Sequence, residues 1–386
     1  MSNQHQIKAD LSQIISKLSR KQNLTSSEAE YAAKTIFNHL TNNQPDALTL
    51  LSAYFGGLTA KKPTVDELAG MVKAMDATRA FTFNFNNDSP IVTAGGTGGD
   101  TFSTINVTTP AVIIAAAAGA CAIKSGSKSF SSKSGCIDLA EELGINVYAT
   151  QSVVEDCVRS IGTSVWASEG VYPWMRPLIE LAADESASAV MPMLYSLRLM
   201  IAAGLNPFSL TRQIRGVSQP FTQTIADVLV KSGYDRALVV LGFGATEDTR
   251  IDEFSNLGRN VVSEVKPNGS VVTFNFYPEE IGLPRGAAKD VAYPGSHLKN
   301  TQRVANVLSG KDHSACRDLV LLNAAAILYT ADMVVDFKDG YELATQAVDD
   351  GSAAKKLMHL VALSGGQMER LELALNSFTL EEPNVR

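Results

Sequence analysis

The sequence predicts an α/β fold in which a small N-terminal helical domain precedes a large α/β domain with a mainly parallel sheet. Residues 1–80 carry apolar side chains at helical spacing. From residue 90 onward, short apolar runs alternate with helical segments, which is typical of parallel strands joined by helices. The length of 386 residues fits two to three domains, and 45% hydrophobic residues is enough for packed cores.

Two threonines predict helix starts in the N-terminal part. Thr25 and Thr64 are each followed three residues later by a glutamate, Glu28 and Glu67, which is the spacing of a capping box. Residues 83–90 are rich in asparagine and turn formers, so we expect a linker there.

The alternating part begins with the most apolar segment of the chain, 110–123. It is shorter than the roughly 20 residues that span a bilayer, so we expect a buried helix that runs into a strand. Thr109 and Pro110 are expected to be the N-cap and first residue of that helix. Short apolar runs predict strands at 90–94, 120–124, 237–241 and 271–276. Helical patterns lie at 136–143, 173–205, 222–232, 316–329 and 340–349.

The charge and the cysteines exclude several classes of protein. The chain carries 33 Lys and Arg against 40 Asp and Glu, a formal net charge of −7. General binding to nucleic acid or to an anionic membrane needs a basic surface, so the charge argues against both partners. The four cysteines show neither CxxC pairing nor metal-ligand spacing, which indicates reduced thiols. Residues 1–10 are polar and lack the apolar region of a signal peptide, so we expect a cytoplasmic protein.

A glycine-rich loop, Gly95-Gly96-Thr97-Gly98-Gly99-Asp100, follows the first predicted strand and leads toward the apolar helix. Glycines let the backbone approach a ligand closely, and the positive end of the helix dipole should lie nearby. The loop matches neither a Walker A motif nor GxGxxG, and a plain tight turn explains the loop alone equally well.

The residues after the loop favour an anion site. No acidic residue lies between Asp100 and Asp138, whereas the interval holds Lys124, Lys128 and Lys133 and many hydroxyls. Lysines and hydroxyls without competing carboxylates predict a site for phosphates. The alternative is a solvated serine-rich loop.

Asp252 and Glu253 are adjacent carboxylates that could hold Mg²⁺ together with phosphate oxygens, although such a pair is more often surface decoration. None of the five histidines lies between residues 40 and 296, which argues against zinc sites and histidine triads there. No residue is identified as a nucleophile or base. These features favour transfer from a phosphorylated donor by positioning and electrostatics.

Together the motifs resemble the anthranilate phosphoribosyltransferase family, of the nucleoside phosphorylase class, over residues 14–365. The resemblance is carried by Gly96-Thr97-Gly98-Gly99-Asp100, Asn106-Val107-Thr108-Thr109, Lys124-x-Gly126, Ser131-Ser132-Lys133-Ser134-Gly135, Asp252-Glu253, Gly282-Leu283-Pro284-Arg285 and Asn323-Ala324-Ala325-Ala326.

The resemblance implies a helical domain of residues 1–85 joined by 173–205, and an α/β domain of 86–172 and 206–386. It implies a homodimer formed through the helical domain. The donor would be phosphoribosyl pyrophosphate, bound with Mg²⁺, and an amine nitrogen would displace pyrophosphate at the ribose C1.

The resemblance also implies the roles of individual residues. Thr108, Asp252 and Glu253 would serve the metal. The donor-binding residues would be Gly96, Gly98, Gly99, Asp100, Thr104, Asn106, Thr109, Lys124, Ser131 and Ser132.

The acceptor side departs from the family pattern. Ser125 and Ser127 stand where the family has a histidine and an asparagine, and Ala182 stands near the position of an arginine that meets the acceptor's carboxylate. Losing that arginine would forfeit a charge-assisted pair worth roughly 1.5–3 kcal/mol, unless Arg176 or Arg198 replaces it.

Aromatic residues near this segment have two interpretations. Tyr172, with Trp174 and Tyr195, could form the wall of an acceptor pocket for a flat ring, or all three could belong to the core.

Four functions stay open at this point. The first is an Mg²⁺-dependent phosphoribosyltransferase for an aromatic or heteroaromatic amine with altered acceptor residues. The second is a genuine anthranilate phosphoribosyltransferase of tryptophan biosynthesis. The others are a pyrimidine nucleoside phosphorylase and a non-catalytic nucleic-acid-binding relative.

Overall fold

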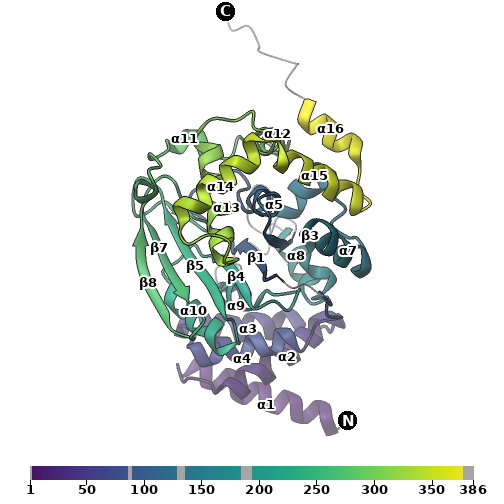
Figure 1. Ribbon diagram of the computed structural model, residues 1–386. Coiled ribbons are helices and arrows are strands. Elements are labelled where there is room, and N and C mark those ends of the chain that lie inside the picture. The colour runs from purple at the N-terminus through teal and green to yellow at the C-terminus, as the bar shows by residue number, and fades with distance from the viewer. Residues whose placement is uncertain (1, 86–88, 128–134, 184–193, 377–386) are drawn as a thin grey trace, which may run out of the picture.

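The computed structural model describes residues 2–85, 89–127, 135–183 and 194–376. Four N-terminal helices form a bundle at one end of the molecule, drawn in purple in Figure 1. They are α1 (Ser2–Ser19), α2 (Ser26–Thr41), α3 (Ala47–Lys61) and α4 (Val65–Asp76). Two helices from the middle of the chain join this bundle: α8 (Met175–Ala183) contacts α2, and α9 (Tyr195–Gly204) packs on α3 and α4.

Both predicted capping boxes are confirmed. The Thr25 hydroxyl accepts a hydrogen bond from the Glu28 N–H, and the Glu28 carboxylate accepts one from the Thr25 N–H. Thr64 and Glu67 form the same reciprocal pair at the start of α4. Each box satisfies backbone donors that would otherwise lack a partner in the first helical turn.

The sheet of the α/β part has the order β3-β2-β1-β4-β5-β7-β8 among the described residues, with β6 paired to β5. Strands β3, β2, β1, β4 and β5 run parallel, and β6, β7 and β8 are antiparallel additions, so the predicted mainly parallel sheet is confirmed. The strands are β1 (Ile91–Gly96), β2 (Cys121–Gly126), β3 (Thr163–Ala167), β4 (Arg212–Gly216), β5 (Arg236–Phe243), β6 (Arg250–Ile251), β7 (Asn260–Val265) and β8 (Val271–Phe276).

Two hydrophobic cores lie on the two faces of the sheet. In β5, Val239 belongs to the core shared with α10 and the helical bundle, whereas its neighbours Leu238 and Val240 belong to the core beneath α5, α13 and α15. This alternation is expected because successive side chains of a strand point to opposite faces. The remaining helices are α5 (Thr108–Ala117), α6 (Cys136–Glu142), α7 (Gln151–Ile161), α10 (Thr222–Lys231), α11 (Ala288–Val291), α12 (His297–Leu308), α13 (Ala315–Thr330), α14 (Phe337–Asp349), α15 (Ser352–Leu363) and α16 (Met368–Asn376).

The structure corrects one predicted helix start. Helix α5 begins at Thr108, and its N-cap is Val107, which makes no side-chain capping bond. Thr109 is therefore inside the first turn, and Pro110 occupies a position where its missing N–H is harmless. The predicted domain limits, 1–85 with 173–205 against 86–172 with 206–386, stay a prediction.

Within the described ranges, no helix combines the length and the apolar character that crossing a membrane requires.

Candidate functional site

A cavity of about 250 Å³ lies at the carboxyl ends of the parallel strands. Strands β1 and β4 are neighbours in the sheet although two strands separate them in the chain. In open α/β sheets such a reversal of strand order leaves a crevice outside the strand ends, where ligands commonly bind. Gly96 at the end of β1 and Gly126 at the end of β2 line this cavity. We call the lining at these strand ends and the loops that follow them the floor.

Most of the predicted site residues line this one cavity. Ser131 and Ser132 lie outside the described residues, and Ala182 lies near the end of α8. The predicted residues that line the cavity are Gly96, Gly98, Gly99, Asp100, Thr104, Asn106, Thr108, Thr109, Lys124, Ser125, Ser127, Asp252 and Glu253.

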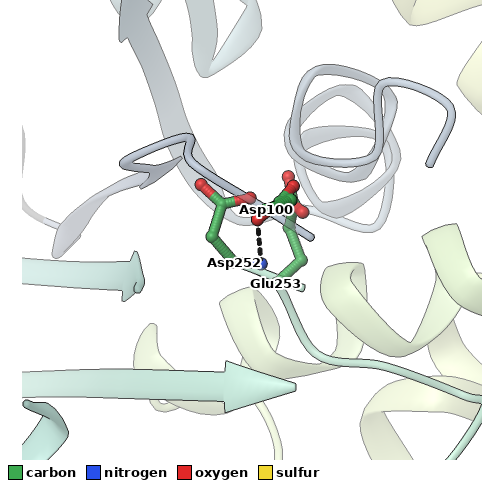
Figure 2. A group of neighbouring side chains, drawn as sticks. All are labelled: Asp100, Asp252 and Glu253. Carbon is green, nitrogen blue, oxygen red and sulfur yellow. Dashed lines mark hydrogen bonds between the residues drawn. The ribbon is translucent and has the colours of Figure 1, made fainter. Parts of the chain in front are cut away.

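Three carboxylates meet on the floor, as Figure 2 shows. Asp100, Asp252 and Glu253 each place a carboxylate oxygen within 4.8 Å of the others. The Asp252 N–H donates to Asp100 Oδ1 at 2.9 Å, which fixes the glycine loop against the segment after β6. The Thr108 hydroxyl donates to Glu253 Oε1 at 3.2 Å. The predicted metal residues are thus in direct contact.

The electrostatics of this cluster suit a cation. Burial first, and then the neighbouring carboxylates, raise the pKa of Asp100 and the pKa of Glu253 well above their ordinary values. Without a cation, protons relieve the repulsion between these carboxylates. A bound divalent cation would relieve the same repulsion. The ligands are all oxygens, the set that Mg²⁺ prefers, so the residues present fit this ion.

Two glycines make room for Asp252. A Cβ atom on Gly96 would lie 2.1 Å from Asp252 Oδ2, and one on Gly216, at the end of β4, would lie 1.4 Å from the Asp252 carbonyl oxygen. Any larger residue would therefore push the acid away from the strand ends. The glycines explain why the cluster sits directly against the sheet.

The glycine loop bends at Gly99, whose φ of +85° is a conformation that side chains rarely adopt. The Gly98 N–H donates to Asp252 Oδ2 at 2.5 Å, and the Gly98 carbonyl accepts from Ser218 Oγ at 3.0 Å. A Cβ on Gly99 would lie 2.5 Å from Arg198 Nη1. These two hydrogen bonds fix the glycine loop, and the guanidinium of Arg198 lies beside it.

The hydroxyl and amide groups of the floor differ in their partners. Asn106 Oδ1 accepts from Asn300 Nδ2 of α12 at 2.7 Å, so this amide is held in place. Thr109 is fully buried, and its hydroxyl has no hydrogen-bond partner among the described residues. A buried hydroxyl facing a cavity without a partner is suited to a polar ligand atom.

The other side of the cavity is the helical wall, formed by α8, α9 and the residue before α9. It is apolar except for Arg198 within the described part of the chain. Its members are Met175, Leu178, Leu194, Leu197, Arg198 and Ile201. Arg198 has no ion-pair or hydrogen-bond partner among the described residues, whereas Arg176 is exposed and does not line the cavity. Of the two substitute arginines, Arg198 is the one that the structure brings to the site.

Of the two interpretations of the aromatic residues, the structure favours the core over the pocket wall. Tyr172 and Trp174 are fully buried in the core of the helical bundle, and neither they nor Tyr195 line the cavity. The Trp174 ring stacks on Phe37 with the ring centres 4.2 Å apart, and the Tyr172 hydroxyl accepts a bond from Arg79 Nε at 3.1 Å. These rings therefore pack between helices, and the helical wall presents Arg198 and non-aromatic apolar side chains to the cavity instead.

Sequence reasoning missed one charged residue of the floor, Arg215 in β4. It is 2% exposed and lines the cavity. The signal was present but misleading, since the polar sequence Arg212-Gln213-Ile214-Arg215-Gly216 does not resemble a buried strand. An arginine in such a strand is itself an indication of a polar site.

The fold and the site place the chain in a class of transferases. Residues 12–78 match the helical bundle domain of the glycosyl transferase family, and residues 88–354 match the α/β domain of that family. A helical bundle beside an α/β domain, with a glycine loop and an acid cluster at the strand ends, thus defines a glycosyltransferase.

Relatives and solved structures narrow the class. The anthranilate phosphoribosyltransferase of Methanococcoides burtonii is 31% identical over 357 residues, which covers 91% of this chain and 94% of that protein. The Natronomonas pharaonis enzyme of the same name is 33% identical, over 90% and 97%. The chain therefore belongs to the anthranilate phosphoribosyltransferase family and is an enzyme of the phosphoribosyltransferase type.

Solved structures share the fold along nearly the whole chain. The Thermus thermophilus anthranilate phosphoribosyltransferase superimposes with a TM-score of 0.75 at 26% identity, covering 91% of this chain and 99% of that one. The Saccharomyces cerevisiae enzyme, solved in complex with PRPP and Mg, gives 0.77 at 23% identity, covering 92% and 98%.

Proposed function

We propose that the protein is an Mg²⁺-dependent phosphoribosyltransferase that transfers the phosphoribosyl group of phosphoribosyl pyrophosphate to the nitrogen of an aromatic or heteroaromatic amine. The observation that carries this proposal is the cluster of Asp100, Asp252 and Glu253 beside the Gly98–Gly99 turn, in which Asp252 is buried and the other two are half-buried. A raised carboxylate pKa and oxygen-only ligands suit a divalent cation that is itself paired with phosphates.

The floor would bind the donor. Backbone N–H groups of the glycine loop, the buried Thr109 hydroxyl and Lys124 would contact its phosphates and ribose, and Arg198 would meet phosphate oxygens from above Gly99. Thr108, Asp252 and Glu253 would hold the metal. Bound Mg²⁺ supplies positive charge that neutralises the departing pyrophosphate.

The chain's residues act by placing the reactants. The acceptor nitrogen forms a bond to the ribose C1 as the bond from C1 to pyrophosphate breaks, and the nitrogen loses its proton to solvent or to pyrophosphate. No residue of the floor is assigned as nucleophile or base. Cationic and N–H groups fixed before the reaction stabilise the leaving charge, since they need no reorganisation.

The helical wall would cover the acceptor. Leu178, Leu197 and Ile201 offer the apolar surface that a flat ring needs, while Ser125 and Ser127 offer hydroxyls from the opposite side. Anthranilate itself is the second candidate acceptor, and the names of the relatives that are 31% and 33% identical favour it. In that case the chain is an anthranilate phosphoribosyltransferase of tryptophan biosynthesis.

Two further statements stay predictions. The first is a homodimer formed through the helical domain, which size-exclusion chromatography with light scattering would test. The second is the cytoplasmic location. The family assignment favours a transferase over the phosphorylase and the nucleic-acid-binding alternatives.

The test of the function is a binding titration followed by a turnover assay. Phosphoribosyl pyrophosphate should bind the purified protein by calorimetry with Mg²⁺, and should bind far more weakly with EDTA. A panel of aromatic amines and heteroaromatic acids, with anthranilate included, would then be scored by pyrophosphate release. Absence of donor binding with Mg²⁺ would refute the proposal. Efficient turnover of anthranilate would select the second candidate.

A further inference from the structure

The segment after β6 carries two acids of the cluster and then continues through the interior of the molecule. Residues 254–258 are buried, yet they belong to no helix or strand. Buried backbone N–H and C=O groups need hydrogen-bond partners, and outside regular structure side chains commonly supply them. The partners of this segment therefore show what holds the acids in place.

Two asparagines each bind both backbone groups of one residue in this segment, an arrangement that we call a clamp. Asn323 of α13 accepts from the Phe254 N–H at 3.1 Å and donates to the Phe254 carbonyl at 2.8 Å. Asn260, the first residue of β7, accepts from the Ser255 N–H at 2.7 Å and donates to the Ser255 carbonyl at 2.9 Å. Each side chain thus replaces the pair of bonds that a neighbouring antiparallel strand would form.

Asn323 is a polar residue in an apolar helix. Residues 319–328 of α13 are apolar apart from this asparagine, which is 7% exposed. A buried amide is costly unless its polar atoms are bonded. Its Nδ2 donates to the Leu319 carbonyl at 2.9 Å as well as to Phe254. Both N–H groups of the amide are therefore used, which fixes the orientation of the side chain.

Glu253 lies between two fixed points of the backbone. On one side, the Asp252 N–H is bonded to Asp100. On the other side, Asn323 holds both polar groups of Phe254. Fixing the backbone on both sides fixes the direction in which the Glu253 side chain leaves it, and this side chain faces the other two carboxylates (Figure 2).

A small cavity distinguishes the two asparagines. It has a volume of about 10 Å³, and Asn323, Asp252 and Glu253 are among the residues that line it. The amide of Asn323 and the acid pair therefore border the same space. Asn260 lines neither this cavity nor the large one. The two clamps thus have the same chemistry but different positions relative to the candidate metal site.

We propose that Asn323 is a positioning residue for the metal site, which holds the Glu253 carboxylate where a divalent cation needs it by clamping Phe254. Asn260, in contrast, contributes only to the stability of the segment. Asn323 does not line the large cavity, so it acts through Glu253 and not on the donor. This inference rests on the proposed function and deepens it. Groups that orient metal ligands typically contribute about 10- to 100-fold to metal affinity or activity.

The experiment compares the two clamps in the full-length protein. Asn323→Leu and Asn260→Leu each remove one clamp with a side chain of similar size, and Asn323→Ser and Asn260→Ser are milder changes that leave space for water. Mg²⁺ alone is titrated first, with the melting temperature as the readout. Phosphoribosyl pyrophosphate is then titrated by calorimetry at a series of Mg²⁺ concentrations and in EDTA. Melting without Mg²⁺ identifies any variant that fails to fold.

Both leucine variants should melt at a lower temperature than the wild type, because each leaves a buried N–H and a buried carbonyl without partners. Only the Asn323 variants should also need more Mg²⁺ for half-maximal donor binding, by about tenfold in Asn323→Leu, and gain less stability from Mg²⁺ alone. The Mg²⁺ requirement of the Asn260 variants and the donor affinity of all variants in EDTA should stay within about twofold of the wild type, because neither depends on the direction of Glu253.

Three outcomes would overturn the inference. In the first, the folded Asn323 variants need no more Mg²⁺ than the wild type. In the second, the Asn260 variants raise the Mg²⁺ requirement as much as the Asn323 variants do, which makes both clamps a matter of stability. In the third, donor affinity falls equally with Mg²⁺ and in EDTA, which indicates a distorted cavity. Failure of the proposed function looks different, because the wild type would then not bind phosphoribosyl pyrophosphate, while Mg²⁺ alone would still stabilise it more than it stabilises the Asn323 variants.

Discussion

The floor of the cavity and the helical wall opposite it differ in chemistry and in origin. The floor consists of strand ends and the loops that follow them, and it carries glycines, hydroxyls and the acid cluster. The helical wall comes from α8 and α9, and Arg198 is its charged residue within the described ranges. Strand ends are fixed by the register of the sheet, whereas a helix face can exchange side chains with little effect on the fold. The side chains of the helical wall can therefore vary more freely than those of the floor.

The largest expected effect comes from removing the proposed metal ligands of the floor. Asp252→Asn with Glu253→Gln should lower the affinity for phosphoribosyl pyrophosphate with Mg²⁺ by about 100-fold or more, because the donor's charge would then lack its counter-ion. Calorimetry with and without Mg²⁺ measures this, and the two titration curves of the variant should coincide.

The chain offers a matched control in a second adjacent acid pair, Glu279 and Glu280, which is exposed and outside the cavity. Glu279→Gln with Glu280→Gln should bind the donor as the wild type does. Equal losses in both double variants would mean that net charge, and not the cluster, governs donor binding.

The floor could be predicted from sequence because its residues follow strands in short, contiguous motifs. The residues of the loop from Gly96 to Asp100 and of the pair Asp252-Glu253 are consecutive in the sequence, so each motif can be recognised as a unit. The sheet then brings the two motifs together. What escaped prediction is Arg215, since a buried strand with two arginines violates the apolar pattern by which strands are recognised. β4 itself was missed for the same reason.

The helical wall was harder to predict. Tyr172 and Trp174 are candidates for it by sequence, yet they are buried between helices, and the side chains of the wall that face the cavity are apolar and non-aromatic apart from Arg198. Periodicity shows that a helix has an apolar face but not which neighbour that face contacts. Whether an aromatic side chain lines a cavity or fills a core depends on packing between segments that are distant in sequence.

A second variant tests whether the helical wall contributes to donor binding. Arg198→Gln should weaken phosphoribosyl pyrophosphate binding about tenfold, the value of one charge-assisted hydrogen bond, because its guanidinium lies over Gly99. The control is Arg176→Gln, which removes an exposed arginine of α8. If Arg198→Gln changes acceptor affinity and leaves donor affinity unaltered, the helical wall belongs entirely to the acceptor.

The pH dependence of stability tests the acid cluster of the floor, for which the helical wall has no counterpart among the described residues. Asp100 and Glu253 have raised pKa values in the folded protein, so the folded state holds protons that the unfolded chain releases near pH 4. Stability of the metal-free protein should therefore fall as the pH rises from about 4 through those raised pKa values. Melting temperatures measured in EDTA should show this decline as the pH rises.

Mg²⁺ should flatten this decline, because a bound dication replaces the protons. Asp252→Asn should flatten it as well, since it removes one of the three repelling carboxylates. A melting temperature that rises with pH in EDTA would show that these carboxyl groups are not proton-loaded in the folded state.

The smallest expected effect lies where the floor meets the acceptor. Ser125 and Ser127 line the cavity, and Ser125 is buried next to Lys124. Replacing them with the histidine and asparagine of the family pattern, Ser125→His with Ser127→Asn, adds hydrogen-bond donors on the acceptor side only. A hydrogen bond contributes about 0.5–1.5 kcal/mol, so kcat/KM for anthranilate should rise by a few-fold, with unchanged donor affinity. Pyrophosphate release at saturating donor measures it. If the double variant turns over anthranilate more slowly but keeps its turnover of another amine, the two serines fit a different acceptor. In that case this part of the floor differs from the family pattern together with the helical wall.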